Sequence, residues 1–191
     1  QAAIGGHYRI CAIGENDGEI AISTGAHPYW ASTRPAGDPY WDRILGAPAQ
    51  TSAVKLCRLD DLAAELALKP PFLLKLDVQG GEVGVLRGAP RILTETDAVI
   101  VEVDIEDFAP IHAALDQAGL VLFDLTQFNR APDETLGWFY PLYVSRRVAA
   151  KMTDVNRSMP EGVKVRTVYD RTYLVDATLK TVRTNLFEGA L

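Results

Sequence analysis

The sequence predicts an α/β protein with a doubly wound, mostly parallel Rossmann-like sheet. Short apolar runs alternate with segments of helix-like spacing, the order typical of strand–helix–strand units. Residues 98–103 form an apolar run, ending in acid at Glu102, of the kind buried in parallel sheets. With 191 residues and 48% hydrophobic content, the chain can bury a full core.

The N-terminal third is predicted to supply three strands and one long loop. Residues 8–14 and 19–23 are predicted strands joined by a turn whose Asp-Gly pair is typical of a hairpin. Residues 24–52 have no clear period and predict a functional lid or a disordered stretch. Residues 54–58 resume as a strand, and Asp60 or Asp61 is expected to cap the short helix that follows.

The central unit is a predicted strand, turn and helix over residues 73–88. Its apolar strand gives way at residues 79–81 to helix-like spacing. Lys75 and Asp77 lie two apart, hence on one face, near the carboxyl end where open parallel sheets bind ligands. They form either a structural ion pair or part of a site. Glu82 falls in the first turn of the helix, where a carboxylate complements the dipole.

The rest of the chain continues the alternation and ends in a segment of different character. His112 lies beside an apolar helix face and is expected to be structural. We therefore predict an α/β domain over residues 1–150 and an accessory tail over 151–191, either a hairpin plus a helix or an oligomerisation arm. The later elements of the domain are expected at residues 98–103 (strand), 108–119 (helix), 120–125 (strand) and 138–145 (strand).

Composition excludes several classes of function. The formal charge of −6 and the lack of a basic cluster argue against nucleic acid or an anionic membrane as the main partner. No segment approaches a transmembrane span or a signal sequence, so a cytoplasmic location is expected. Cys11 and Cys57 have no metal-type spacing and are expected to be buried, reduced thiols, and no metal site is predicted.

Four ordered stretches resemble the FkbM family of S-adenosylmethionine-dependent methyltransferases and together cover about residues 8–147. The family's opening strand, which ends in Asp-x-Gly-Ala-Asn-x-Gly and holds the methionine part of the cofactor, has no counterpart in this sequence. The resemblance therefore implies a class I methyltransferase fold whose N-terminal strands are missing from this chain. The stretches are residues 12–18 (AIGENDG), 58–62 (RLDDL), 75–89 (KLDVQGGEVGVLRGA) and 99–103 (VIVEV).

The resemblance implies O-methylation of a hydroxyl on a small molecule, sugar or polyketide, with S-adenosylmethionine as cofactor. It places Asp77 beside the acceptor as a base or orienting group and Gln79 as an acceptor-binding amide. Lys75 would pair with Asp77 or with Glu102, and a buried structural network of these three residues is the equal alternative. Glu82 is a supporting residue of the same turn.

The cofactor's adenine and the acceptor would have further contacts. By resemblance, Ile13 flanks the adenine and Glu15 lies near its amino group, although a plain hairpin turn explains Glu15 equally well. Trp30 and Trp41 could stack on a sugar or polyketide ring, and packing of the loop over the core is the alternative. His27 in the same loop is an alternative base.

Other classes of protein differ from this one in their motifs. The turn after residue 79 lacks the Gly-x-Gly-x-x-Gly spacing of a nicotinamide-binding domain, and no P-loop is present. A degenerate methyltransferase-like domain that acts as a non-catalytic binding module stays open. The expected partners are a small-molecule or glycan acceptor and, as an option, a second copy of the chain.

Overall fold

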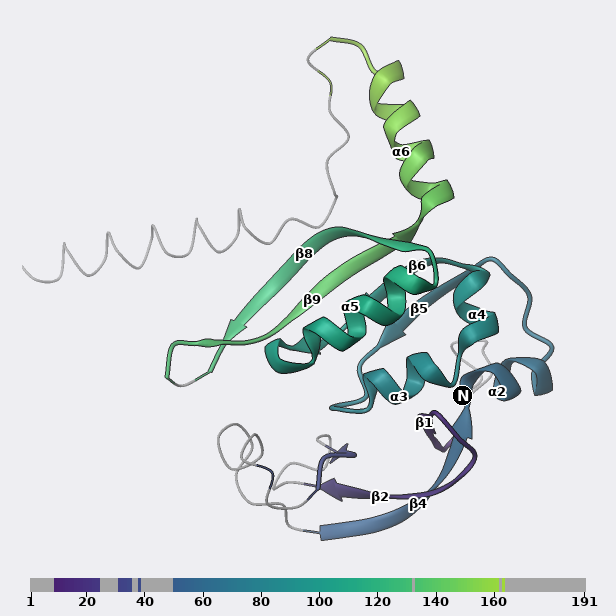
Figure 1. The fold of residues 1–191 in the computed structure, drawn as a ribbon, viewed down its shortest axis with the longest axis vertical. Coiled ribbons are helices and arrows are strands. Elements are labelled where there is room, and N and C mark those ends of the chain that lie inside the picture. Colours follow the sequence, from purple (N-terminus) through teal and green to yellow (C-terminus); the bar gives the residue numbers. More distant parts are fainter. Residues whose placement is uncertain are drawn as a thin grey trace, which may run out of the picture. The chain divides into compact units, whose positions relative to one another are not determined.

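The computed structural model describes residues 9–24, 31–35, 38, 50–131, 133–161 and 163 (Figure 1). The backbone divides into two units, Gln1–Ala150 and Lys151–Leu191. Helix α6 (Arg146–Ser158) spans that division. The hairpin and helix considered for the tail fall almost entirely on residues outside the described part of the chain.

The first sheet has the strand order β1-β4-β2-β3. β4 lies between β1 and β2, so the hairpin predicted between the first two strands does not form. The Asp17 side chain in the connecting turn instead accepts a hydrogen bond of 3.0 Å from the backbone N–H of Arg58, at the end of β4. The strands are β1 (Ala12–Gly14), β2 (Gly18–Thr24), β3 (Ala31–Ser32) and β4 (Gln50–Arg58).

The second sheet has the order β5-β6-β9-β7, with β8 paired to β9. β5 and β6 run parallel, and β9 runs antiparallel to β6, β7 and β8. The long strand β9 therefore lies inside the sheet and contacts three neighbours. The strands are β5 (Phe72–Leu76), β6 (Thr96–Val101), β7 (Val103–Asp104), β8 (Leu120–Arg130) and β9 (Leu136–Ser145).

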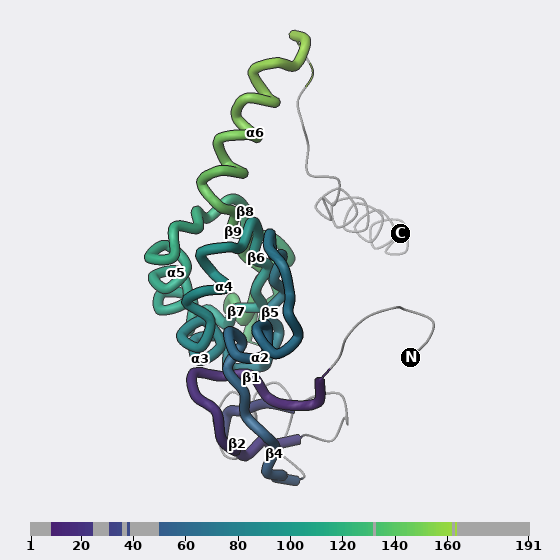
Figure 2. Tube along the Cα trace, turned by 90° about the vertical axis from the view of Figure 1, so that its right-hand side faces the viewer, coloured from purple at the N-terminus to yellow at the C-terminus, as the bar shows by residue number. Residues whose placement is uncertain are grey.

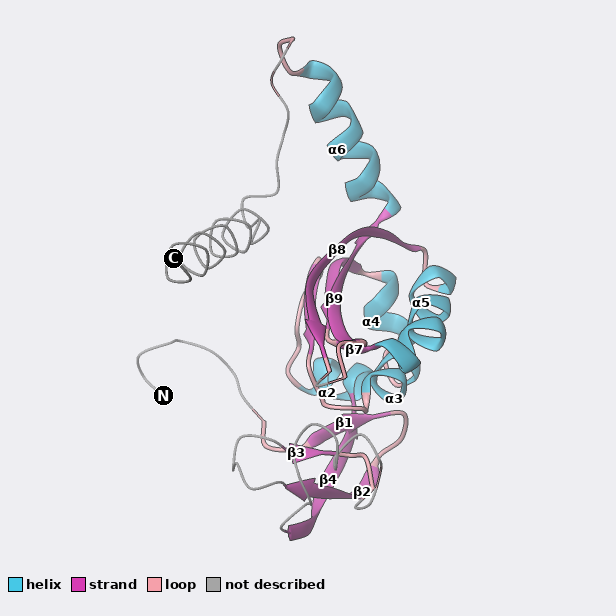
Figure 3. Cartoon of the chain, turned by 90° about the vertical axis from the view of Figure 1, so that its left-hand side faces the viewer, coloured by secondary structure: helices cyan, strands magenta, loops and turns pink. Residues whose placement is uncertain are grey.

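Helices pack against the second sheet, and Figure 3 shows α4 and α5 on the same side of β8 and β9. Val99, Val101 and Tyr143 from the strands and Ile111 and Leu115 from α5 are fully buried in the core between them. The helices are α2 (Leu59–Glu65), α3 (Glu82–Arg87), α4 (Pro90–Thr94), the 3-10 helix η1 (Ile105–Asp107) and α5 (Phe108–Gln117).

The prediction of a doubly wound, mostly parallel sheet is wrong. Of the seven pairings among the described strands, β1 with β4 and β5 with β6 are parallel, and the other five are antiparallel. The fold is mixed α/β with two antiparallel-rich sheets. Five residues, 131–135, separate β8 from β9, too few for the crossover that parallel strands need, so the two strands form a hairpin.

Helix α3 is tightly packed against β1, and Figure 2 shows the two elements side by side. Gly88, at the end of α3, faces the backbone of Gly14 so closely that a Cβ atom at residue 88 would overlap the Gly14 carbonyl oxygen. The Gly88 carbonyl accepts a hydrogen bond of 3.3 Å from the Asp60 N–H. This contact fixes the first sheet against the helices of the second.

The buried carboxylate of Asp60 caps α4 rather than its own helix. Its Oδ2 accepts a hydrogen bond of 2.9 Å from the Arg91 N–H, and its Oδ1 accepts one of 2.9 Å from the Ile92 N–H. These N–H groups are unpaired within a helix at its first turn. The cap position of α2 is Arg58, with no side-chain cap bond, and Asp60 and Asp61 both lie in the first turn, so the predicted capping of this helix by Asp60 or Asp61 is wrong.

His112 lies in a structural setting, as expected. Its ring stacks on Phe108 with centroids 5.6 Å apart, and its Nδ1 lies 3.1 Å from the Tyr143 hydroxyl.

Cys11 and Cys57 are free thiols but only partly buried, which corrects the prediction that they are buried. Burial, then the neighbouring Cys57 thiol, raises the pKa of Cys11.

Candidate functional site

The turn after β5 is built around the carboxylate of Glu82. Glu82 is buried, with 5% of its surface exposed. Its two oxygens accept hydrogen bonds from the backbone N–H groups of Val78 (3.1 Å) and Gly80 (3.0 Å). Gln79 and Gly80 both have positive φ, at 53° and 94°, a conformation that costs energy for a residue other than glycine. Glu82 thus holds the backbone on both sides of Gln79 and stabilises its left-handed conformation.

Glu82→Gln is expected to change how stability depends on pH. Burial raises the pKa of Glu82 above its ordinary value, although backbone N–H groups oppose this effect. The folded state therefore binds this proton more tightly than the unfolded state, and the resulting stabilisation is lost as pH rises through the raised pKa. In urea titrations from pH 4 to 8, the stability advantage of wild type over the glutamine variant should shrink with increasing pH. The decrease should be about 1.4 kcal/mol for each pH unit that separates the folded-state pKa from the unfolded-state pKa.

The control for this prediction is Glu106→Gln, which alters an exposed carboxylate in η1. It gives the effect of replacing an exposed carboxylate by an amide under the same conditions. A Glu82→Gln difference that stays constant, or that grows with pH, would contradict a raised pKa at Glu82.

Asp77 lies in a hydrogen-bonded cluster at the carboxyl end of β5. The Lys75 ammonium contacts Asp77 Oδ2, as their shared face predicts. The Gln79 amide nitrogen donates to Asp77 Oδ1 at 3.1 Å and to Glu102 Oε1 at 3.0 Å. One amide therefore joins the two carboxylates. Of the pairings left open for Lys75, the structure places it on Asp77.

Glu102 is fixed by its position between two strands. Its backbone N–H donates to the Leu76 carbonyl at 2.8 Å, which extends the parallel pairing of β5 and β6. Across the antiparallel pairing with β9, the Tyr140 hydroxyl donates a hydrogen bond to Glu102 Oε2. The Lys75 ammonium lies 6.0 Å from the Tyr140 ring centroid, within the range of a cation–π contact. Tyr140 was not predicted from the sequence.

The surroundings of the two carboxylates move their pKa values in opposite directions. Burial raises the pKa of Asp77, but the hydrogen bonds from Lys75 and Gln79 and the Lys75 charge outweigh burial, so the net pKa is lowered. Burial raises the pKa of Glu102, and the negative charge of Asp77 adds to that effect against the bonds from Tyr140 and Gln79. Such a division is typical of paired carboxyl groups with different chemical roles.

A short segment of the first sheet reaches this turn. The Ser32 hydroxyl, in β3, donates to the Gln79 carbonyl oxygen, and the Arg34 N–H donates to Ser32 Oγ at 3.0 Å. The Arg34 guanidinium, 15% exposed, bridges Asp104 Oδ2 (2.7 Å) and Asp107 Oδ2 (2.6 Å). Ser32 and Arg34 thus connect the turn after β5 to the segment after β6. Neither was predicted, because their neighbourhood in the sequence has no periodic pattern.

Two of the other predicted site residues, Ile13 and Glu15, have partners outside this cluster. Ile13 is partly buried and packs against the core. Glu15 forms an ion pair of 3.5 Å with Arg87. Trp30, Trp41 and His27, predicted as two acceptor contacts and an alternative base, lie outside the described residues.

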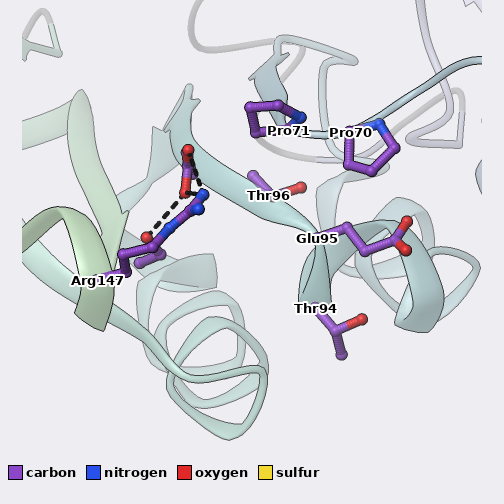
Figure 4. Close-up of a pocket in the computed structure, with 8 residues that line it drawn as sticks. Pro70, Pro71, Thr94, Glu95, Thr96 and Arg147 are labelled. Atoms are coloured by element: carbon purple, nitrogen blue, oxygen red, sulfur yellow. Dashed lines mark hydrogen bonds and ion pairs between the residues drawn. The ribbon is translucent and has the colours of Figure 1, made fainter.

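A separate hollow lies at the amino ends of β5 and β6, whereas the cluster around Asp77 lies at their carboxyl ends (Figure 4). Its volume is about 450 Å³, and its lining includes Pro70, Pro71 and Thr96. Arg147 at its rim pairs with both oxygens of Asp97, at 2.6 and 2.7 Å. Glu95, also in the lining, pairs with Arg91 outside it at 3.7 Å. These charged groups are held in ion pairs at the surface, unlike the linked carboxylates around Asp77.

Neither a metal cluster nor a membrane span occurs within the described residues. They contain no group of three or more His, Cys, Asp or Glu side chains that could hold a metal ion. None of the described helices is long and apolar enough to cross a membrane.

The C-terminal part of the chain is similar to much larger proteins. Residues 141–191 match the AcrB/AcrD/AcrF family model. Protein HelA of Legionella pneumophila is 65% identical over 48 residues, and the cobalt-zinc-cadmium resistance protein CzcA of Cupriavidus metallidurans is 58% identical over 48 residues. Each match covers 25% of this chain but only 5% of HelA and 4% of CzcA. The chain thus spans a small fraction of these relatives.

The larger part of the chain matches a different family. No solved structure matches the chain significantly. Residues 3–122 match the model of the methyltransferase FkbM domain, which is more than half of the chain and includes β5, α3 and β6 with Asp77, Gln79 and Glu102. The resemblance carried by the four sequence stretches is therefore confirmed, and the chain belongs to the FkbM methyltransferase family.

Proposed function

We propose that the intact protein transfers a methyl group from S-adenosylmethionine to a hydroxyl oxygen of a small molecule or glycan, and that Asp77 and Gln79 bind this acceptor. One observation carries the proposal. In a chain of the FkbM methyltransferase family, the carboxylate of Asp77, the amide of Gln79 and the carboxylate of Glu102 are joined at the carboxyl ends of β5 and β6, where open sheets bind ligands.

The donor set of the cluster fits the reactive end of this cofactor. Two carboxylates and one ammonium give the cluster a net negative charge, which favours a sulfonium cation nearby. When bound, S-adenosylmethionine supplies an activated methyl carbon. The adenosine end stays a prediction: Ile13 and Glu15 would have to contact it from their positions beside the core and Arg87.

The chain's own residues would orient the acceptor. Asp77, with a lowered pKa, stays ionised at neutral pH and is suited to accept a hydrogen bond from an acceptor hydroxyl. Its side chain is 35% exposed, so an incoming hydroxyl can reach it. The side-chain nitrogen of Gln79 binds the two carboxylates, and its side-chain oxygen can accept a hydrogen bond from a second acceptor hydroxyl. Correct alignment of donor and acceptor supplies a large part of the rate in such displacements.

The test combines binding and turnover. S-adenosylhomocysteine is titrated calorimetrically into this chain and into the product of the complete open reading frame that encodes it. Transfer of labelled methyl from S-adenosylmethionine is then measured on a panel of glycosides and phenolic polyketides. Asp77→Asn should keep binding within about threefold and lower methyl transfer about 100-fold. The control, Asp116→Asn, alters an exposed residue of α5 and should change neither.

Two results would overturn the proposal. If neither protein binds S-adenosylhomocysteine, the rival function of a non-catalytic binding module replaces methyl transfer. If binding and transfer occur and Asp77→Asn transfers methyl at the wild-type rate, the acceptor lies elsewhere. The same preparations show by sedimentation whether the predicted second copy of the chain is present.

A further inference from the structure

The two carboxylates of the cluster are held by chemically different partners. Asp77 contacts the ammonium of Lys75, a positive charge that stabilises the ionised carboxylate. Glu102 accepts from two neutral donors, the Tyr140 hydroxyl and the Gln79 amide. A neutral donor stabilises a carboxylate less than a full charge does. Glu102 therefore keeps the greater affinity for a proton.

We infer that Glu102, rather than Asp77, accepts the proton of the acceptor hydroxyl, and that Tyr140 is a positioning residue that holds Glu102 for this step. The inference rests on the proposed methyl transfer and adds to it the division of work between the two carboxylates. Nothing in the sequence pattern singles out Tyr140. It enters the site because β9 runs antiparallel beside β6 and β7.

Glu102 is held well enough to act as a base. Its backbone is fixed by the hydrogen bond to the Leu76 carbonyl, its two oxygens accept from Gln79 and Tyr140, and the Asp77 carboxylate also lies within hydrogen-bonding reach. A carboxylate offers about four acceptor positions, so room remains for a substrate hydroxyl. Gln79 joins Glu102 to Asp77 through one nitrogen, so an acceptor that donates one hydroxyl to Asp77 would bring a neighbouring hydroxyl, the one to be methylated, close to Glu102.

The reaction moves one proton and one methyl group. The acceptor's O–H bond breaks and its proton moves to a Glu102 oxygen. The acceptor oxygen then uses the freed electron pair to bond to the methyl carbon, while the carbon–sulfur bond of the donor breaks with its electrons left on sulfur. The products are a methyl ether, S-adenosylhomocysteine and a protonated Glu102, which releases its proton to water.

The charges around Glu102 support this role. Among the described residues, the titratable groups that act on Glu102 are Asp77, in the turn after β5, and Tyr140, from β9, while the Lys75 ammonium lies against Asp77 and the Tyr140 ring. Burial and the Asp77 charge raise the pKa of Glu102 above its ordinary value. A base is most effective when its pKa lies near the working pH, whereas the lowered pKa of Asp77 makes that group a weak base.

The first test needs neither cofactor nor acceptor. Carboxyl carbons of the full chain are labelled with ¹³C and titrated by NMR, and Glu102→Gln and Asp77→Asn assign the two signals. Glu102 should titrate at the higher pH. Tyr140→Phe should raise its pKa further, by about half to one unit, because a donor to the ionised form is lost. Tyr143→Phe removes a hydroxyl from the opposite, core-facing side of β9 and should leave Glu102 unmoved.

The second test uses the pH dependence of kcat. Wild type should lose activity at low pH as Glu102 becomes protonated. Tyr140→Phe should move this acidic fall in activity to higher pH, and Asp77→Asn should move it to lower pH. Glu102→Gln should lower kcat about 10²- to 10⁴-fold, and its remaining activity should no longer fall at low pH.

The assignment fails if Glu102 titrates below Asp77, or if Tyr140→Phe leaves the Glu102 signal unmoved. It also fails if the acidic loss of activity persists in Glu102→Gln and disappears in Asp77→Asn, because the roles are then reversed. The NMR result is independent of methyl transfer, so failure of this assignment is distinguishable from failure of the proposed function.

Discussion

Gly88→Ala is expected to lower the free energy of unfolding by about 3 kcal/mol. The new Cβ atom would overlap the carbonyl oxygen of Gly14. Neither atom can move aside by rotating a side chain, because the oxygen belongs to the backbone and the Cβ atom is bonded directly to it. Gly88 has φ −82°, which alanine adopts readily, so the cost comes from the contact and not from conformation. Urea denaturation followed by circular dichroism measures the change.

The matched control is Gly84→Ala, in the same helix and facing the same strand. A Cβ atom there would lie 3.7 Å from the Glu15 nitrogen and 3.8 Å from the Gly14 Cα, ordinary contact distances. Alanine is favoured over glycine inside a helix, so this variant should be neutral or up to about 1 kcal/mol more stable. If the two variants have equal stability, the close packing of α3 on β1 is disproved.

Asp60→Ala is expected to destabilise the protein by about 2–4 kcal/mol, since each buried, unsatisfied donor costs about 1–3 kcal/mol. Without the carboxylate, the N–H groups of Arg91 and Ile92 lose their acceptors. Ile92 is 2% exposed, so water cannot easily replace the lost oxygen. Hydrogen exchange should show that the amide of Ile92 loses protection more than amides of β6.

Asp61→Ala provides the comparison, because this adjacent carboxylate is exposed and its described partner is Arg58 at 3.3 Å. An exposed pair of this kind contributes little, and the variant should lie within about 0.5 kcal/mol of wild type. A larger effect at Asp61 than at Asp60 would mean that the cap of α4 is not the source of stability.

The local part of the site could be predicted from the sequence. Spacing of two along a strand placed Lys75 and Asp77 on one face, and the structure joins them. The turn after Asp77 and the helix from Glu82 were also predicted from apolar periodicity and glycine. These features depend on residues close together in the chain, whose geometry is fixed by backbone sterics and local hydrogen bonds.

The distant part of the site could not be predicted, because periodicity does not identify a strand's neighbour. Residues 120–125 and 138–145 were predicted as separate strands of a parallel sheet. In the structure β8 extends to Arg130 and β9 begins at Leu136, so the connection is short and the pairing antiparallel. That reversal brings Tyr140 to Glu102. The Asp60 cap was missed for a similar reason, since its partners lie 31 and 32 residues away.

The position of β9 bears on how such a chain can be recombined. The FkbM match ends at residue 122, but β9, which supplies Tyr140 and the buried Phe139 and Tyr143, lies wholly beyond it. Because β9 pairs with β6, β7 and β8, its removal would leave the edge of β6 unpaired and the core without two aromatic rings. A gene fusion joined at residue 122 would therefore need its new partner to supply a replacement strand that pairs along β6 and fills the core.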